Sequence, residues 1–165
     1  MLSHIRVVDF CSGVSQFAGH LLARLGAEVI AVEPPTGVTT RHMGPYANNT
    51  PDPNRSLTHW AYNCGKKSVT LDIEVQRDKE KFCDLLRGSD ILLEDCHPEY
   101  LASLGLSIKE LSQINPKLIH ASITPYGSNG PRSHWLGTDL TAAAGSSFMY
   151  ASGDADRAPL RVGLP

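Results

Sequence analysis

Apolar positions in the first third of the chain fall into two short runs separated by a segment of helical spacing. The runs at residues 5–10 (IRVVDF) and 28–33 (EVIAVE) are apolar at their centres, as in strands of a parallel sheet that is covered on both faces. Between them, residues 15–26 carry apolar side chains three and four apart and end in Gly26, a residue typical of helix C-termini. The pattern predicts a β-α-β unit.

The same alternation continues towards the C-terminus. Ser107 and Glu110 have the spacing of a helix capping box. The predicted elements are a strand at 68–73, a helix at 75–88, a strand at 90–95, two short helices at 98–105 and 107–115, a strand within 116–127 and a helix of small residues at 138–150. Alternating strands and helices predict an α/β fold with a Rossmann-like, doubly wound, mostly parallel sheet.

Between the second and third predicted strands, residues 34–58 are rich in proline and lack periodicity. A loop of this length is more often functional or mobile than a simple connection. In doubly wound folds, ligands bind at the carboxyl ends of the strands. The segments that follow predicted strands are therefore the candidate site: residues 11–16, 34–41, 95–97 and 125–139.

Composition and charge narrow the class of protein. The chain has 165 residues, 41% of them hydrophobic and 19% charged, which is typical of a globular domain. A net charge of -2, with acidic and basic residues interspersed, does not favour nucleic-acid binding. There is no apolar run long enough for a membrane span and no secretory signal at the N-terminus. We expect a cytoplasmic protein.

Cysteine and histidine spacing indicates no metal site. The four cysteines form no CxxC pair, and the seven histidines form no HxxxH or HExxH pair. We expect the cysteines to be reduced and partly buried.

Sequence motifs alone assign no reaction. The dinucleotide fingerprint GxGxxG, a P-loop lysine and a GxSxG elbow are all missing. Gly13 and Ser15 could bring backbone N–H groups to a phosphate at a helix N-terminus, or could form an ordinary strand-to-helix turn.

Four further positions are open to two interpretations. Arg41 could bind a phosphate or carboxylate, or lie solvated on the surface. Lys66, with its neighbour Lys67, could attract a polyanionic cofactor, although adjacent lysines are usually solvated. His97 could be functional or a local hydrogen-bond partner. Asp139 lies at a predicted helix start and could cap that helix.

Five segments in fixed order carry a resemblance to a known family over residues 5–165: LLARLGAEVIAVEPP, GKKSVTLDI, DILLEDCHPEYLASLGLS, NPKLIHASITPYGSNGP and GTDLTAAAG. Together they resemble the N-terminal half of the family III CoA-transferases. The resemblance implies a Rossmann-like domain with coenzyme A along the strand ends, a smaller second domain and a homodimer of interlocked chains. Its substrates would be an acyl-CoA and a carboxylic acid acceptor. An aspartate would attack the thioester, and the CoA would pass through an aspartyl thioester.

The resemblance also implies cofactor-binding residues near the first two strands. Ser15 and Gln16 match a CoA-contacting pair approximately, because the turn before them is one residue shorter than in typical members. Pro34 replaces an arginine of formyl-CoA transferase. Arg41 or Lys66 is expected to compensate for that lost contact.

Further along, Leu71 falls where the family packs the adenosine portion. Asp95, Cys96 and His97 match the segment that lines the CoA channel. Asp95 and Cys96 stand where the family usually has Asn and Phe, so that wall of the channel is expected to be altered.

Gly137, Thr138 and Asp139 match a segment beside the thioester, with Asp139 as a supporting acidic residue in catalysis. The related 2-methylacyl-CoA racemase uses a histidine at the position of Thr138 as a base. Because threonine cannot act as a base at neutral pH, the resemblance favours a transferase over a racemase-like enzyme.

The aspartate nucleophile of the family follows the segment that matches residues 158–165, so it is expected just past Pro165. Residues 160–165 form an apolar run, which also suggests that the natural chain continues. We expect residues 1–165 to be the CoA-binding N-terminal part of a larger protein that has a second domain. The alternatives are a non-catalytic CoA-binding fragment or subunit, and a Rossmann-like module for another nucleotide.

Overall fold

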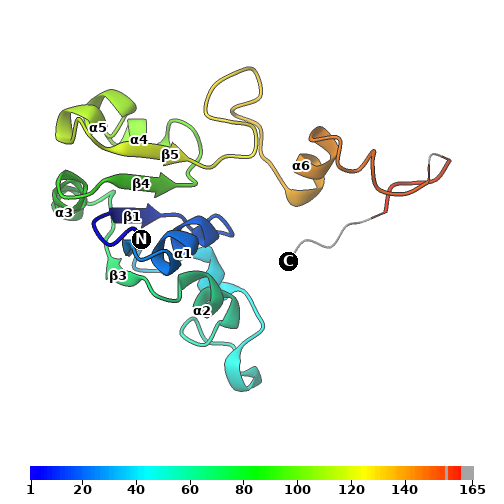
Figure 1. Ribbon diagram of the computed structural model, residues 1–165, viewed down its shortest axis with the longest axis horizontal. Helices are drawn as coiled ribbons and strands as arrows, with labels where there is room; N and C mark the ends of the chain where they lie inside the picture. Colours follow the sequence, from blue (N-terminus) through cyan, green and yellow to red (C-terminus); the bar gives the residue numbers. More distant parts are fainter. Residues whose placement is uncertain (155, 161–165) are drawn as a thin grey trace. The chain divides into compact units, whose positions relative to one another are not determined.

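Five parallel strands form a sheet in the computed structural model, which describes residues 1–154 and 156–160 (Figure 1). The strands are β1 (Arg6–Phe10), β2 (Glu28–Glu33), β3 (Lys67–Thr70), β4 (Ile91–Glu94) and β5 (Ile119–Ser122). Their order is β3-β2-β1-β4-β5, and every neighbouring pair is parallel. Strands β2 and β3 lie on one side of β1, and β4 and β5 lie on its other side. This confirms the predicted doubly wound α/β fold.

Helices connect the strands, largely where the apolar spacing predicts them. They are α1 (Gln16–Arg24), α2 (Leu57–Asn63), α3 (Gln76–Arg87), α4 (Tyr100–Ser103), α5 (Ile108–Ile114) and α6 (Asp139–Gly145). The capping box of α5 is confirmed, because Ser107 Oγ accepts from the Glu110 N–H while Glu110 Oε2 accepts from the Ser107 N–H.

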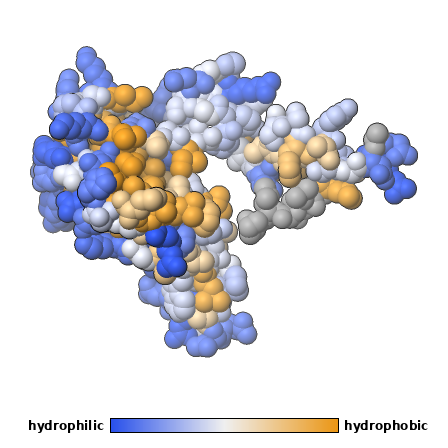
Figure 2. Space-filling view, viewed as in Figure 1, coloured by the Kyte–Doolittle hydropathy of each residue, from blue (hydrophilic) through white to orange (hydrophobic). Residues whose placement is uncertain are grey.

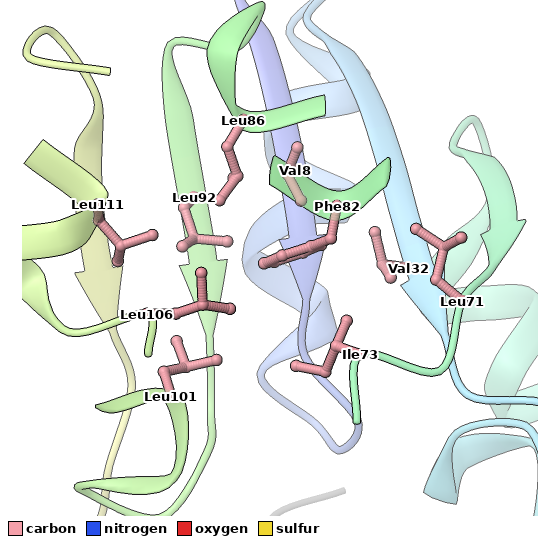
Figure 3. Packing of buried hydrophobic residues seen from close by; sticks show 10 residues of the cluster. All are labelled: Val8, Val32, Leu71, Ile73, Phe82, Leu86, Leu92, Leu101, Leu106 and Leu111. Atoms are coloured by element: carbon pink, nitrogen blue, oxygen red, sulfur yellow. The ribbon is translucent and has the colours of Figure 1, made fainter. Parts of the chain in front are cut away.

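Neighbouring residues of β1 belong to cores on opposite faces of the sheet. Val8 belongs to a core with residues of α3, α4 and α5; its ten buried members are Val8, Val32, Leu71, Ile73, Phe82, Leu86, Leu92, Leu101, Leu106 and Leu111 (Figure 3). Val7 belongs to the second core, whose buried members are Val7, Cys11, Ala27, Val29 and Leu93. Since both faces of the sheet are covered, neighbouring residues of a central strand, such as Val7 and Val8 of β1, are both apolar. This explains the continuous apolar runs in the sequence.

Helix α1 packs on the second core through Ala18, Leu22 and Ala23, and Gly19 is buried. Two other apolar side chains of α1 are largely exposed: Phe17 is 47% exposed, as is Leu21. They contribute to the apolar surface that Figure 2 shows over this helix.

The segment after β2 is more ordered than the sequence predicts. It contains two short 3-10 helices, Thr39–His42 and Ala47–Asn49, and a β-bridge between Tyr46 and Ser56. The prediction of an irregular loop over 34–58 is therefore wrong in part. It also missed α2, whose buried residue is the polar His59 rather than an apolar side chain.

Two predicted boundaries are also wrong. Strand β3 ends at Thr70, so Leu71 and Ile73 enter the core from the segment that follows the strand. Helix α6 ends at Gly145, five residues before the predicted end, and Ser146–Tyr150 continue as turns.

The described chain divides into two compact units, Met1–Ile123 and a second unit that starts at Thr124. Within the described residues, we find no helix with the length and apolar character needed to cross a bilayer. The segment that the resemblance places before the nucleophile runs into residues 161–165, which lie outside the described residues.

Candidate functional site

A pocket of about 600 Å³ opens at the carboxyl ends of β1, β2 and β4. This edge includes the switch in strand order between β1 and β4, where ligands bind in doubly wound folds. The lining residues are Phe10, Cys11, Ser12, Val32, Pro34, Pro35, Thr36, Val38, Leu71, Asp72, Ile73, Glu74, Asp95, Cys96, His97 and Tyr100. Its size falls within the range of small-molecule sites, and it combines an apolar wall with a few polar groups.

Asp95 joins the ends of β1 and β4. Its carboxylate accepts hydrogen bonds from the Ser12 N–H at 2.9 Å and the Gly13 N–H at 3.1 Å, and a third from the Ser15 hydroxyl. These donors belong to the turn that leads into α1. Ser15, a predicted cofactor contact, therefore reaches the pocket through Asp95.

Two thiols, Cys11 and Cys96, line the pocket. Burial raises the pKa of Cys96 to about 12, with a further contribution from the charges of Glu94 and Asp95. Burial, followed by the charges of Asp9 and Asp95, also raises the pKa of Cys11 far above its ordinary value. Both thiols are therefore protonated at neutral pH and are not nucleophiles.

The rim of the pocket is acidic. The Tyr100 hydroxyl donates to Glu74 Oε1 at 3.2 Å, and burial together with this hydrogen bond raises the pKa of Tyr100 to about 12. Asp72 lies beside Glu74 and accepts from the Glu74 N–H at 3.1 Å. His97 is exposed, with Nδ1 2.7 Å from the Pro98 carbonyl oxygen. The pocket therefore offers mainly hydrogen-bond acceptors at its rim.

Lys66 is buried away from this pocket, contrary to its prediction as a cofactor contact. Its side chain is 1% exposed, and Nζ donates to Asp9 Oδ2 at 2.6 Å, to the Gln16 carbonyl at 2.7 Å and to Asn63 Oδ1 at 2.9 Å. All three N–H donors of the ammonium group have protein acceptors. Lys66 therefore ties β1, α1 and α2 together instead of facing a ligand.

Gln16 is also buried, 1% exposed, and does not line the pocket. Its amide nitrogen donates to the Cys11 carbonyl at 2.9 Å, while its oxygen accepts from Thr40 at 2.7 Å and from Asn63 at 3.0 Å. His59 Nδ1 contacts the same Thr40 hydroxyl and Asn63 amide at 3.0 and 3.1 Å. The Gln16 side chain therefore connects the end of β1 to Thr40 and Asn63 in this structure.

Arg41 forms a two-point ion pair with Glu33 at the end of β2. Nη2 donates to Glu33 Oε1 at 2.8 Å and Nε donates to Oε2, while Ser68 Oγ donates to Oε1 at 2.7 Å. Burial opposes ionisation of Glu33, but the hydrogen bonds from Arg41 and Ser68 outweigh it and lower the pKa of Glu33. Arg41 therefore fixes the loop that carries Thr36 and Val38 of the wall.

The second unit holds the remaining predicted residues. Gly137 packs so closely on Pro125 that an added Cβ would lie 2.2 Å from the proline Cβ. Thr138 caps α6 by accepting from the Thr141 N–H, and Thr141 Oγ1 accepts from the Thr138 N–H at 2.8 Å. Asp139 is exposed in the first turn of α6. The predicted side-chain cap at Asp139 is thus wrong; Thr138 supplies it.

Of the residues predicted to bind the cofactor, four line the pocket, namely Leu71, Asp95, Cys96 and His97. Their contact with a cofactor stays a prediction. The sequence interpretation missed Asp72, Glu74 and Tyr100. The available signal was the acidic pair Asp72 and Glu74 after a strand, hidden because the strand was expected to continue to Ile73.

A comparison with protein families identifies the family of this chain. The model of CoA-transferase family III matches residues 2–165, and the chain belongs to this family.

Curated relatives include the succinyl-CoA:(R)-benzylsuccinate CoA-transferase subunit BbsE of Thauera aromatica, which is 41% identical over 97% of this chain and 39% of its own length. Formyl-CoA:oxalate CoA-transferase of Streptomyces avermitilis is 36% identical over 98% of this chain and 39% of its own length. The succinate–glutarate CoA-transferase of Agrobacterium fabrum is 35% identical over 99% of this chain and 42% of its own length. The chain thus spans about two fifths of the length of these relatives.

Two solved structures have the same fold as this chain. A CAIB/BAIF family protein from Brucella suis superposes with a TM-score of 0.86 at 32% identity, covering 99% of this chain and 43% of that one. A mutant of Rv3272 from Mycobacterium tuberculosis gives a TM-score of 0.83 at 34% identity, covering 99% and 44%.

Proposed function

We propose that the protein containing this chain transfers coenzyme A from an acyl-CoA to a carboxylic acid. The observation that carries the proposal is the family match over residues 2–165. The pocket at the carboxyl edge of the sheet, with Asp95, Cys96 and His97 in its wall, supports binding of part of the CoA ester there. The names of two relatives pair a CoA thioester with a carboxylic acid, and the third names two carboxylic acids. We extend that chemistry to this protein.

The proposed reaction passes through a covalent aspartyl intermediate, on an aspartate outside residues 1–165. Its carboxylate attacks the thioester carbonyl and expels the CoA thiolate, which leaves a mixed anhydride. The thiolate then attacks the aspartyl carbonyl, releasing the donor acid and forming an aspartyl thioester. The acceptor carboxylate attacks the aspartyl thioester carbonyl and expels the CoA thiolate, which leaves a second mixed anhydride. The thiolate then attacks the acceptor's acyl carbonyl, which forms the new acyl-CoA and frees the aspartate. Each carbonyl passes through an oxyanion that needs N–H donors.

The pocket residues of this chain have a proposed role in binding. Leu71, Cys96 and His97 form the wall against which the CoA ester packs. Burial raises the pKa of Cys11 and Cys96, so neither thiol is proposed as the nucleophile.

We propose a supporting role for the second unit. Gly137 and Thr138 lie beside the thioester in the assembled enzyme, and Asp139 is the supporting acidic residue there. Exposure of Thr138 and Asp139 in this unit leaves them accessible to a substrate.

Assembly and location follow as further proposals. A homodimer with a second domain, located in the cytoplasm, fits the family resemblance and the free thiols at Cys11, Cys64, Cys83 and Cys96. The partners are then an acyl-CoA and a carboxylic acid, with no nucleic acid involved.

The test is a transfer assay on the protein at its natural length. Succinyl-CoA, acetyl-CoA and formyl-CoA are each mixed with a panel of carboxylates, and new thioesters are separated by chromatography. A covalent aspartyl thioester is reduced by borohydride, so treatment in the presence of acyl-CoA should inactivate the enzyme and change its mass. Transfer without such trapping would refute the aspartyl route, and absence of any transfer would refute the function.

A second candidate is a non-catalytic subunit of a CoA-transferase. It is favoured by the relative from Thauera aromatica, which is named as a subunit. In that case the isolated natural-length protein would transfer no CoA in the assay above, and activity would appear when its partner subunit is added.

A further inference from the structure

We propose that Asp95 determines which part of the CoA ester this pocket accepts, by holding a negative charge in the turn where α1 begins. The inference rests on the proposed function and adds a specificity-determining residue to it. Asp95 selects the uncharged portions of the ester and turns its phosphates away from the turn.

The first argument is the occupation of the turn. In a β-α-β unit, the N–H groups before the first helix and the positive end of its dipole ordinarily receive a phosphate. In this chain the N–H groups of Ser12 and Gly13 donate to Asp95 at 2.9 and 3.1 Å, and the Ser15 hydroxyl donates to it as well. A phosphate could use these donors only by displacing a carboxylate that is already hydrogen-bonded to them.

The second argument is the charge of the whole pocket. Asp72 and Glu74 add two more carboxylates to the lining, and among the described lining residues none is lysine or arginine. The two cations expected to compensate, Lys66 and Arg41, are paired with Asp9 and Glu33. No lysine or arginine of the described lining therefore offsets repulsion of a phosphate by the lining carboxylates.

The third argument is what the lining does favour. Phe10, Val32, Val38 and Leu71 supply apolar surface for a ring or an alkyl chain. The carboxylates accept hydrogen bonds from hydroxyl and amino groups. The uncharged portions of a CoA ester carry such groups, so they fit this lining while the phosphates remain outside it.

The test measures binding of four probes to the natural-length protein by titration calorimetry: adenosine, ADP, pantetheine and CoA. Asp95→Asn removes the charge and keeps an oxygen that can accept from Ser12. We expect it to tighten ADP and CoA binding by about tenfold at low salt, with the gain shrinking as salt is added. Adenosine and pantetheine should change less than twofold. The control is Asp84→Asn, because Asp84 pairs with Arg87 on α3 and does not line this pocket.

A uniform change across all four probes, or no change for ADP and CoA, would overturn the role of Asp95. Should Asp95→Asn fail to fold, Glu74→Gln at the rim replaces it, with a shift in the same direction expected and Glu80→Gln as its control. Failure of CoA and adenosine to bind the unaltered protein would instead overturn the proposed function and this inference with it. Binding of CoA with unchanged selectivity in the variants would overturn the inference alone.

Discussion

Replacing Lys66 with methionine should destabilise the protein more than any other single lysine replacement near the sheet. Lys66→Met keeps a side chain of similar length but removes the ammonium group. The Asp9 carboxyl group, which is 1% exposed, then loses its cationic partner and keeps the Cys11 N–H at 3.1 Å as a donor. The carbonyl of Gln16 and the amide oxygen of Asn63 also lose a donor.

The size of the effect follows from this burial. The two side chains of the pair are 1% and 0% exposed, so water cannot replace the lost partner. Removing one member of a buried pair costs about 3–5 kcal/mol. With a urea m-value of about 2 kcal/mol/M, the midpoint of unfolding should fall by about 1.5–2.5 M.

Urea unfolding followed by circular dichroism measures this shift. The matched control is Lys67→Met, one residue along, where the lysine side chain is 71% exposed in its pair with Glu28 and little change is expected. The double variant Asp9→Leu/Lys66→Met should recover part of the lost stability, because it leaves no buried charge. Equal midpoints for Lys66→Met and Lys67→Met would refute the reasoning.

Three further outcomes are expected. Phe82→Ala empties the core between α3 and the sheet and should cost about 3–5 kcal/mol in urea unfolding, whereas Phe17→Ala on the exposed side of α1 should cost far less. Ser107→Ala removes the α5 cap and should cost about 1 kcal/mol by the same measurement. Burial, followed by the charge of Arg41, lowers the pKa of His59, so protonation favours the unfolded chain. The free energy of unfolding should fall as the pH drops below about 6.5, and His59→Gln should reduce that fall. The same dependence on pH in the variant would show that His59 does not cause it.

Much of the fold could be predicted because the three inner strands of the sheet, β1, β2 and β4, are buried on both faces. That burial forces the apolar runs at β1, β2 and β4, which a reader of the sequence can find. Helix α2 could not be found in the same way. Its buried side is polar, with His59 and Asn63 in a hydrogen-bond network, and a polar inner face leaves no apolar periodicity.

The candidate site was predictable only where it follows the order of the strands. Asp95 to His97 come directly after β4, so topology brings them to the pocket. The pairing of Lys66 with Asp9 spans 57 positions in sequence and leaves no local pattern. The sequence therefore predicted Lys66 to be available to a cofactor, whereas in the folded protein its ammonium group is buried and paired with Asp9.

The buried pair also depends on a residue that carries no side chain. Helix α1 passes β1 at Gly19, where an added Cβ would lie 2.2 Å from Asp9 Oδ2 and 3.2 Å from Lys66 Nζ. A methyl group there would push the carboxylate or the helix aside. The space that Gly19 leaves is therefore what lets the helix cross the strand directly over the ion pair. We expect Gly19→Ala to destabilise the protein through displacement of Asp9 and Lys66.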